Sequence, residues 1–110
     1  MFKQENRLKS KYEIGLVKRN GANIKGRYFL CLYLRDNTQK KLTVIVSTKF
    51  DKKAVVRNKV KRQIRDIVYK KIDLMPKGFY LFIPKKHIIN TKYEEISSDI
   101  NQVLSAYFKF

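Results

Sequence analysis

From residue 57 to residue 66 the chain reads Arg57-Asn58-Lys59-Val60-Lys61-Arg62-Gln63-Ile64-Arg65-Asp66. On an α-helix, at about 100° per residue, the charged and the apolar side chains of this region separate onto different faces. The apolar face consists of Val56, Val60, Ile64 and Ile67, and the polar face consists of Arg57, Asn58, Lys61, Arg62, Arg65 and Tyr69. The spacing predicts a helix that buries one side in the fold and presents cations on another.

The predicted basic helix runs from about residue 52 to residue 72, and Asp51 is positioned to cap its N-terminus. After a turn at residues 76–78, the nearly all-apolar segment 79–83 is closed by Pro84. An apolar run of this length is typical of a strand in the centre of a sheet, because both of its faces must be buried.

A final helix is predicted from Thr91 and Glu94, which are spaced as a capping box. Its inward-facing positions recur at helical spacing. They are Tyr93, Ile96, Ile100, Val103, Leu104 and Tyr107.

N-terminal to the basic helix, residues 8–19 read as a short amphipathic helix that ends near Gly21, with Leu8, Tyr12 and Leu16 turned inward. Residues 27–34 and 42–47 are rich in strand-forming side chains, and the polar segment 36–41 between them predicts a turn. We expect these two strands to pair as an antiparallel hairpin, with one more short strand near residues 22–27.

The predicted order of elements is helix, short strand, strand, strand, helix, strand, helix, all within one domain covering residues 1–110. This order indicates an α+β fold, a two-layer α/β sandwich with three helices on a mixed sheet of about four strands. The single cysteine, Cys31, lies in an apolar strand and is predicted to be a buried structural thiol.

The net charge of +17 on 110 residues far exceeds what solubility requires of a small domain, and it favours a polyanionic partner. Residues 1–71 hold 21 Lys or Arg against 5 Asp or Glu, so the basic surface belongs to the first two thirds of the chain. No secretory leader pattern or membrane span is found, which favours a cytoplasmic protein that does not bind membranes. Nucleic acid is the partner that this composition predicts.

The basic helix is the predicted binding element. Arg57, Lys61 and Arg65 are spaced at four-residue intervals and form a ridge about two turns long that can follow consecutive phosphates. A solvated helix face normally mixes charges of both signs, yet between residues 52 and 72 the sole acidic side chain is Asp66. The candidate RNA-binding residues are Lys49, Lys52, Lys53, Arg57, Asn58, Lys61, Arg62 and Arg65.

The run from Lys49 to Asp66 closely resembles the signature of the bacterial ribonuclease P protein component: a basic lead-in, then Arg-Asn-x-x-Lys-Arg-x-x-Arg followed by an acid. The resemblance extends to residues 7–9, to Gly21, to residues 27–29 and to the order of elements. It implies a protein, monomeric and cytoplasmic in a bacterium, that assists a catalytic RNA in removing the 5′ leader from precursor tRNA. Catalysis and Mg²⁺ would belong mainly to the RNA, with no metal bound by the isolated protein.

The resemblance also implies a left-handed crossover around the basic helix and a cleft between the first helix and the sheet for the single-stranded leader. This chain departs from the family pattern there: Thr48 replaces a lysine, and Ile14, Lys18 and Leu32 stand at positions that are aromatic in the family. The candidate residues for the leader cleft are Tyr12, Ile14, Lys18, Arg27, Phe29 and Tyr33.

Two other functions are weighed against this one. A protein-only nuclease is disfavoured because His87 is the single histidine, which is expected on a surface loop, and the nine carboxylates are scattered. A structural binder of ribosomal RNA, or a DNA-binding helix, would use the same basic face, and charge does not separate these alternatives.

Overall fold

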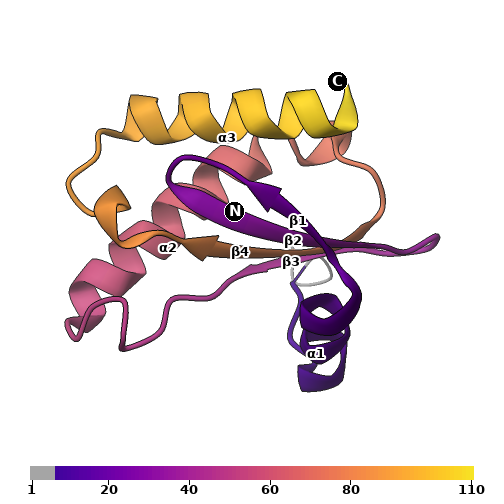
Figure 1. Cartoon of the computed structure of the whole chain (residues 1–110), viewed down its shortest axis with the longest axis horizontal. Helices are drawn as coiled ribbons and strands as arrows, with labels where there is room; N and C mark the ends of the chain where they lie inside the picture. Colours follow the sequence, from indigo (N-terminus) through magenta and orange to yellow (C-terminus); the bar gives the residue numbers. More distant parts are fainter. Residues whose placement is uncertain (1–6) are drawn as a thin grey trace.

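The structure is a computed structural model that describes residues 7–110. Figure 1 shows its three α-helices and one four-stranded sheet. In chain order the elements are α1 (Lys11–Asn20), β1 (Ala22–Lys25), β2 (Phe29–Arg35), β3 (Lys40–Val44), α2 (Ala54–Tyr69), β4 (Gly78–Pro84) and α3 (Tyr93–Phe108). Two short 3₁₀ helices, η2 (Ile72–Leu74) and η3 (Lys86–Ile88), flank β4. The predicted α+β class is confirmed, and so is the short strand before β2.

The apolar strand β4 occupies an inner position of the sheet, as its sequence predicts. The strand order is β1-β2-β4-β3, with antiparallel β1–β2 and β2–β4 pairs and a parallel β3–β4 pair. The predicted hairpin between β2 and β3 is therefore wrong. Because β4 is apolar on both faces, it is buried in the middle of the sheet, where its backbone N–H and C=O groups need a paired strand on each edge. It therefore lies between β2 and β3, the two strands that were expected to pair with each other.

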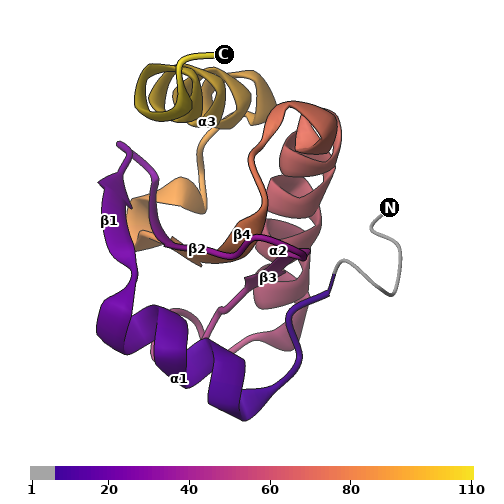
Figure 2. The ribbon, with the colours of Figure 1, turned by 90° about the vertical axis from the view of Figure 1, so that its right-hand side faces the viewer.

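The connection from β3 to β4 passes through α2 and is left-handed. The β4 arrow points to the left in Figure 1, and β3 runs parallel to it. In Figure 2 both strands therefore run away from the viewer, β3 lies to the right of β4, and α2 lies on the α3 side of the sheet. This hand is rare among strand-helix-strand units, and it is the hand that the family resemblance implies.

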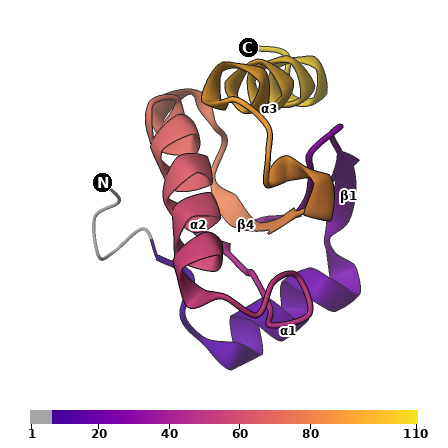
Figure 3. The same ribbon diagram turned by 90° about the vertical axis from the view of Figure 1, so that its left-hand side faces the viewer.

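Helices cover both faces of the sheet. On one face α2 and α3 bury Phe29, Cys31 and Phe82 in the larger hydrophobic core, while α1 crosses the opposite face over Leu32 and Leu81. Figures 2 and 3 show α1 and α3 on opposite sides of the strands. The confirmed fold class thus has one refinement: the helices are divided between the two faces rather than forming a single layer.

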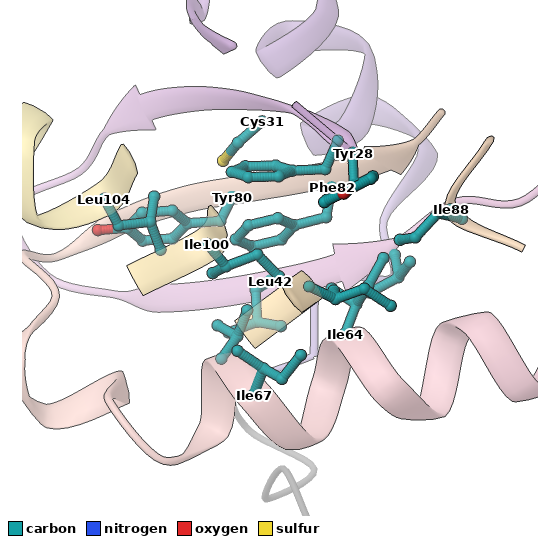
Figure 4. Packing of buried hydrophobic residues seen from close by; sticks show 14 of the residues in the cluster. Tyr28, Cys31, Leu42, Ile64, Ile67, Tyr80, Phe82, Ile88, Ile100 and Leu104 are labelled. Atoms are coloured by element: carbon teal, nitrogen blue, oxygen red, sulfur yellow. The ribbon is translucent and has the colours of Figure 1, made fainter. Parts of the chain in front are cut away.

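The larger core is built from side chains of α2, α3 and the inner strands. Figure 4 shows Ile64 and Ile67 of α2 facing the sheet near Leu42 and Phe82. Cys31 is fully buried, and burial raises the pKa of its thiol far above the ordinary value. The prediction of a buried structural thiol is confirmed.

Several local predictions are wrong at helix ends. The N-cap of α2 is Lys53, without a side-chain hydrogen bond, because Asp51 lies two residues earlier and its carboxylate accepts from the Lys53 N–H (2.8 Å). The N-cap of α3 is Lys92, and the Thr91 hydroxyl donates backward to the His87 carbonyl (3.0 Å) instead of forming a capping box with Glu94.

Two predicted inward tyrosines lie on the surface. Tyr12 in α1 is 71% exposed and Tyr107 in α3 is 46% exposed. In each helix the aliphatic residues at neighbouring turns, Val17 and Leu104, already fill the contact with the sheet. Within residues 7–110, no helix is long and apolar enough to cross a membrane.

Candidate nucleic-acid interface

The two faces of α2 are divided largely as the sequence predicts, but Tyr69, predicted on the polar face, is half-buried and packs against the larger hydrophobic core. Val60, Ile64 and Ile67 are buried, whereas Asn58 and Arg62 are exposed. Arg57, Lys61 and Arg65 are half-buried at the borders of the same outer surface, and Val68 joins the buried side. The burial of one face leaves the cations of this helix on a continuous outer surface, which we call the basic face (Arg57, Asn58, Lys61, Arg62 and Arg65).

Arg57 also holds the segment that leads into the helix. Its Nη1 donates to the carbonyl oxygens of Asp51 (2.8 Å) and Lys52 (2.9 Å). These bonds fold the lead-in against the first turn of α2, so that the exposed Lys49, Lys52 and Lys53 lie beside its N-terminus. The remaining N–H groups of the guanidinium stay available for an anion.

The N-terminus of α2 is itself suited to an anion. Its first turn contains no acidic residue, and no side chain caps it. Unsatisfied backbone N–H groups and the positive end of the helix dipole attract phosphate at such a position. The backbone N–H groups at the start of α2 and the lysines of the lead-in therefore both attract phosphate to the same place.

Arg7 extends the basic face at its other end. The segment of residues 7–8 pairs with β3 through an Arg7–Leu42 bridge and a bond from the Leu8 N–H to the Leu42 carbonyl (2.9 Å). Partial burial lowers the pKa of Arg65, and the positive charge of Arg7 lowers it further. Arg7 was not among the predicted site residues, since only the family resemblance pointed to it and its place depends on a strand pairing that periodicity does not reveal.

The single acid of α2 is engaged by side chains outside the basic face. Asp66 accepts a short hydrogen bond from the Tyr93 hydroxyl of α3, and the Lys70 ammonium lies 3.4 Å from the same carboxylate oxygen. The pKa of Asp66 is lowered, chiefly by the hydrogen bond from Tyr93. Its negative charge is thus engaged at the contact between α2 and α3 and opposes phosphate binding less.

A second surface lies on the sheet beside α1. Leu30 of β2, Ile83 of β4 and Ile45, which directly follows β3, are half-buried and form an apolar strip that ends at the exposed Lys25. Ile14 of α1 packs against the same small hydrophobic cluster as these residues, and Lys18 lies one turn further along the same side of the helix. We call this surface the α1 cleft, after the cleft that the family resemblance implies at this place (Ile14, Lys18, Lys25, Leu30, Ile45 and Ile83).

Three of the predicted cleft residues lie elsewhere. Phe29 and Tyr33 point to the α2–α3 face, since successive strand residues alternate between faces. Phe29 is fully buried, and the Tyr33 hydroxyl donates to the Lys77 carbonyl (3.0 Å). Arg27 lines a pocket beside α3. Their assignment to a cleft between α1 and the sheet is wrong.

Of the other three candidates for the leader cleft, two lie at the α1 cleft and one does not. Ile14 and Lys18 border the α1 cleft, whereas Tyr12 projects about 140° away from the buried Val17 around the helix axis. Leu32 is buried beneath α1 and is therefore not available as a stacking surface. The strip that remains open is aliphatic, formed by Leu30, Ile45 and Ile83.

The carboxylates and the histidine of residues 7–110 form no group of three or more that could hold a metal ion. His87 is exposed, as predicted; one of its ring nitrogens lies 2.8 Å from the Arg27 carbonyl oxygen, and its ring lies beside Tyr28. The Asp99 carboxylate accepts from the backbone N–H groups of Arg27 (3.0 Å) and Tyr28 (2.8 Å), which ties α3 to the start of β2.

The family profile described as Ribonuclease P matches residues 2–107. The chain belongs to the ribonuclease P protein family. The ribonuclease P protein component of Petrotoga mobilis is 34% identical over 106 residues, covering 94% of this chain and 89% of that protein. The component from Thermotoga maritima is 27% identical over 96 residues, covering 86% and 81%.

Solved structures of ribonuclease P proteins have the same fold. The protein from Thermotoga maritima superposes with a TM-score of 0.80 at 25% identity, covering 91% of this chain and 96% of that one. A Staphylococcus aureus ribonuclease P protein mutant superposes with a TM-score of 0.84 at 21% identity, covering 93% and 87%. The second likeness concerns the fold alone.

Proposed function

We propose that this chain is the RNA-binding protein subunit of ribonuclease P, which assists a catalytic RNA in the Mg²⁺-dependent removal of the 5′ leader from precursor tRNA. The observation that carries the proposal is the position of the family signature on α2. Its cations lie on the outer side of the helix, while its apolar residues are buried. Such a rigid, single-signed surface fits the closely spaced phosphates of a folded RNA.

In this proposal the two surfaces have different tasks. The basic face, its lead-in and Arg7 bind the catalytic RNA, and the α1 cleft binds the leader of the precursor tRNA. Chemistry and Mg²⁺ are assigned to the RNA, because the described part of the chain offers no clustered ligands for a metal. The working unit is one protein per RNA in the bacterial cytoplasm.

The aliphatic strip changes what the cleft offers to a leader. Aromatic rings stack on bases with a gain of roughly 1 to 3 kcal/mol per base, whereas Leu30 and Ile83 provide only apolar contact with the base faces. Lys18 and Lys25 add phosphate contacts at the borders of the strip. We therefore expect leader binding that tolerates sequence changes and depends strongly on salt.

The test is cleavage of a precursor tRNA with a 5′ leader at low Mg²⁺, with the protein alone, with a bacterial ribonuclease P RNA alone, and with both. Strong stimulation in the mixture supports the proposal. Cleavage by the protein alone would overturn the assignment of catalysis to the RNA. Absence of stimulation by a matched RNA would favour a structural binder of ribosomal RNA.

The two tasks are separated by a charge reversal in the cleft. Lys18→Glu should raise the KM for a substrate with a long leader while leaving affinity for the catalytic RNA unchanged. A precursor with a one-nucleotide leader serves as the control substrate, since it does not reach the cleft. An equal rise in KM for both substrates would show that Lys18 does not act through the leader.

A further inference from the structure

An aromatic series runs from the core to the surface at the end of the molecule opposite the start of α2. Tyr80 is fully buried, Tyr33 and Phe108 are half-buried, and Tyr107 and Phe110 are exposed. Ring centroids along the series are 4.9 Å apart for Tyr33–Tyr80, 5.0 Å for Tyr33–Phe108 and 4.9 Å for Tyr107–Phe108. Each ring is therefore oriented by its neighbour, including the ring at the surface.

The exposed end of this series borders an open pocket. The pocket lies between the C-terminal turn of α3, the end of β2 and the turn that precedes β4. Figure 1 shows the C-terminal end of α3 on the same side of the molecule as the segment that leads into β4. The side chains that matter for recognition are Tyr107 and Phe108 on one side, and Arg35, Asn37 and Lys77 on the other. The basic face and the α1 cleft share none of these residues.

The pocket is electropositive although it contains an acid. The Asp36 carboxylate accepts hydrogen bonds within its own turn, from the Gln39 N–H (2.8 Å), the Thr38 N–H (3.1 Å) and the Thr38 hydroxyl (3.0 Å). Arg35 and Lys77 are exposed and have no acidic partner among the described residues. The pocket thus combines an aromatic surface, two cations and the side-chain amide of Asn37.

We infer that this pocket binds one unpaired nucleotide of an RNA, with the base against Tyr107 and the phosphate at Arg35 and Lys77. A flat aromatic ring beside cations is the arrangement that single-stranded nucleic acid requires, because the base stacks while the phosphate is neutralised. Asn37 can both donate to and accept from a base edge. A second copy of this chain is disfavoured as occupant, since each copy carries a charge of +17 and would be repelled.

The inference does not depend on the proposed function, and its test needs no catalytic RNA. The isotope-labelled full chain is titrated with adenosine 5′-monophosphate and observed by NMR, with separate titrations by adenosine and by inorganic phosphate at equal ionic strength. We expect shifts at residues 35–37, 107 and 108 with the nucleotide, weaker shifts with adenosine, and none at residues 107 and 108 with phosphate alone.

Tyr107→Ala should weaken nucleotide binding at the pocket at least about fivefold, the lower end of the range for one stacked base. Because Tyr107 is exposed, the variant should fold normally, which its amide spectrum verifies. Tyr12→Ala is the matched control: it removes another exposed tyrosine, on α1, and should leave the signals of the pocket unchanged. Arg35→Gln should reduce the affinity for the nucleotide toward that for adenosine, because Lys77 alone then remains to contact the phosphate.

Three results would overturn the inference. Nucleotide shifts confined to α2 would show that the pocket is not a site. Equal responses to the nucleotide and to inorganic phosphate would remove any role for the base. Shifts at the pocket that depend on protein concentration, without nucleotide, would identify a second copy of the chain as its occupant.

Discussion

Single side chains on the basic face are not equivalent. Arg57 donates to two backbone carbonyls of the lead-in, whereas the Arg62 guanidinium is exposed and makes no hydrogen bond or ion pair with residues 7–110. The sequence places both on one polar arc, because periodicity reports direction but not contacts. Only the structure separates an arginine that also organises the site from one that is free to bind.

Replacement of these arginines should therefore give different results. Arg57→Ala should lower the melting temperature by a few degrees, because each lost hydrogen bond contributes about 0.5 to 1.5 kcal/mol. Arg62→Ala should leave the melting temperature unchanged and reduce the salt dependence of RNA binding by about one counterion. Circular dichroism and RNA titrations at several salt concentrations measure both effects.

The control is Arg62→Lys, which keeps the charge and should keep the salt dependence while losing the forked contact. A large loss of stability in Arg62→Ala would contradict its position outside the fold.

The carboxyl of Asp66 should titrate below the ordinary range. Its pKa is depressed, first by the hydrogen bond from Tyr93, so the stabilisation that it provides is present above the pKa of the unfolded chain and is lost as pH falls through the folded pKa. Tyr93→Phe should move this pKa upward toward the ordinary value, as followed by NMR titration of the carboxyl.

Asp36 supplies an internal reference for that titration. Its pKa is also lowered, by the backbone N–H groups of Gln39 and Thr38, and these are unaffected by Tyr93. An upward shift of Asp36 in Tyr93→Phe would reveal a global change rather than the loss of one hydrogen bond.

At the scale of elements, the glycine inside α1 and the glycine that follows the helix have opposite requirements. A Cβ on Gly21 would lie 2.5 Å from the Val17 carbonyl oxygen and 3.1 Å from that of Tyr33, both backbone atoms. A Cβ on Gly15 would meet only the flexible end of Arg19, at 3.2 Å. Gly21 is therefore needed where the chain leaves α1 for β1, and Gly15 is not needed for steric reasons.

The two substitutions to alanine should change stability in opposite directions. Gly21→Ala should destabilise the fold by about 1 to 3 kcal/mol, because backbone at the junction must move. Gly15→Ala should stabilise it by about 0.5 to 1 kcal/mol, since glycine is entropically costly inside a helix. Urea unfolding of both variants measures the difference, and a destabilising Gly15→Ala would refute our reading of α1.

The sequence predicts where the helices and strands lie along the chain better than it predicts which strands pair in the sheet. The three α-helices and the four strands were located approximately from the sequence, and the two 3₁₀ helices were not. The strands β2 and β3 were paired wrongly because the strand between them, β4, comes 34 residues after the end of β3 at Val44. The face of a helix or strand to which a side chain points follows from local spacing. The neighbours of a strand in the sheet depend instead on which strand must be buried on both faces. The same limit explains why Phe29 and Tyr33 were assigned to the wrong face.

At the scale of the whole molecule, Ile64 connects α2 to the core that the sheet and α3 share. It is fully buried in that core (Figure 4). Ile64→Asp should unfold the protein, because an unpaired buried charge costs several kcal/mol out of a total stability of about 5 to 15 kcal/mol. Asn58→Asp introduces the same charge on the exposed side of the same helix and should remain folded. A cooperative melting curve for Ile64→Asp near that of the unmodified protein would refute the facial assignment.

The candidate site was predictable in part. The basic helix followed from charge and spacing, since both are local properties. The α1 cleft did not, because it is assembled from α1 and three strands whose order the sequence does not give. Tyr107 illustrates the same point at the pocket: its helical spacing indicates burial, yet its side chain is exposed.

The short pairing of residues 7–8 with β3 has a consequence for how the protein behaves at high concentration. β3 is an outer strand, and the Leu8 N–H occupies the Leu42 carbonyl on its open side. The other outer strand, β1, has four residues and carries the exposed Lys25. An uncovered edge strand exposes unpaired backbone N–H and C=O groups, which can pair with a strand of another molecule and lead to fibrils. With one edge partly covered and the other short and charged, this sheet is protected against adding strands from other copies of the chain at high concentration.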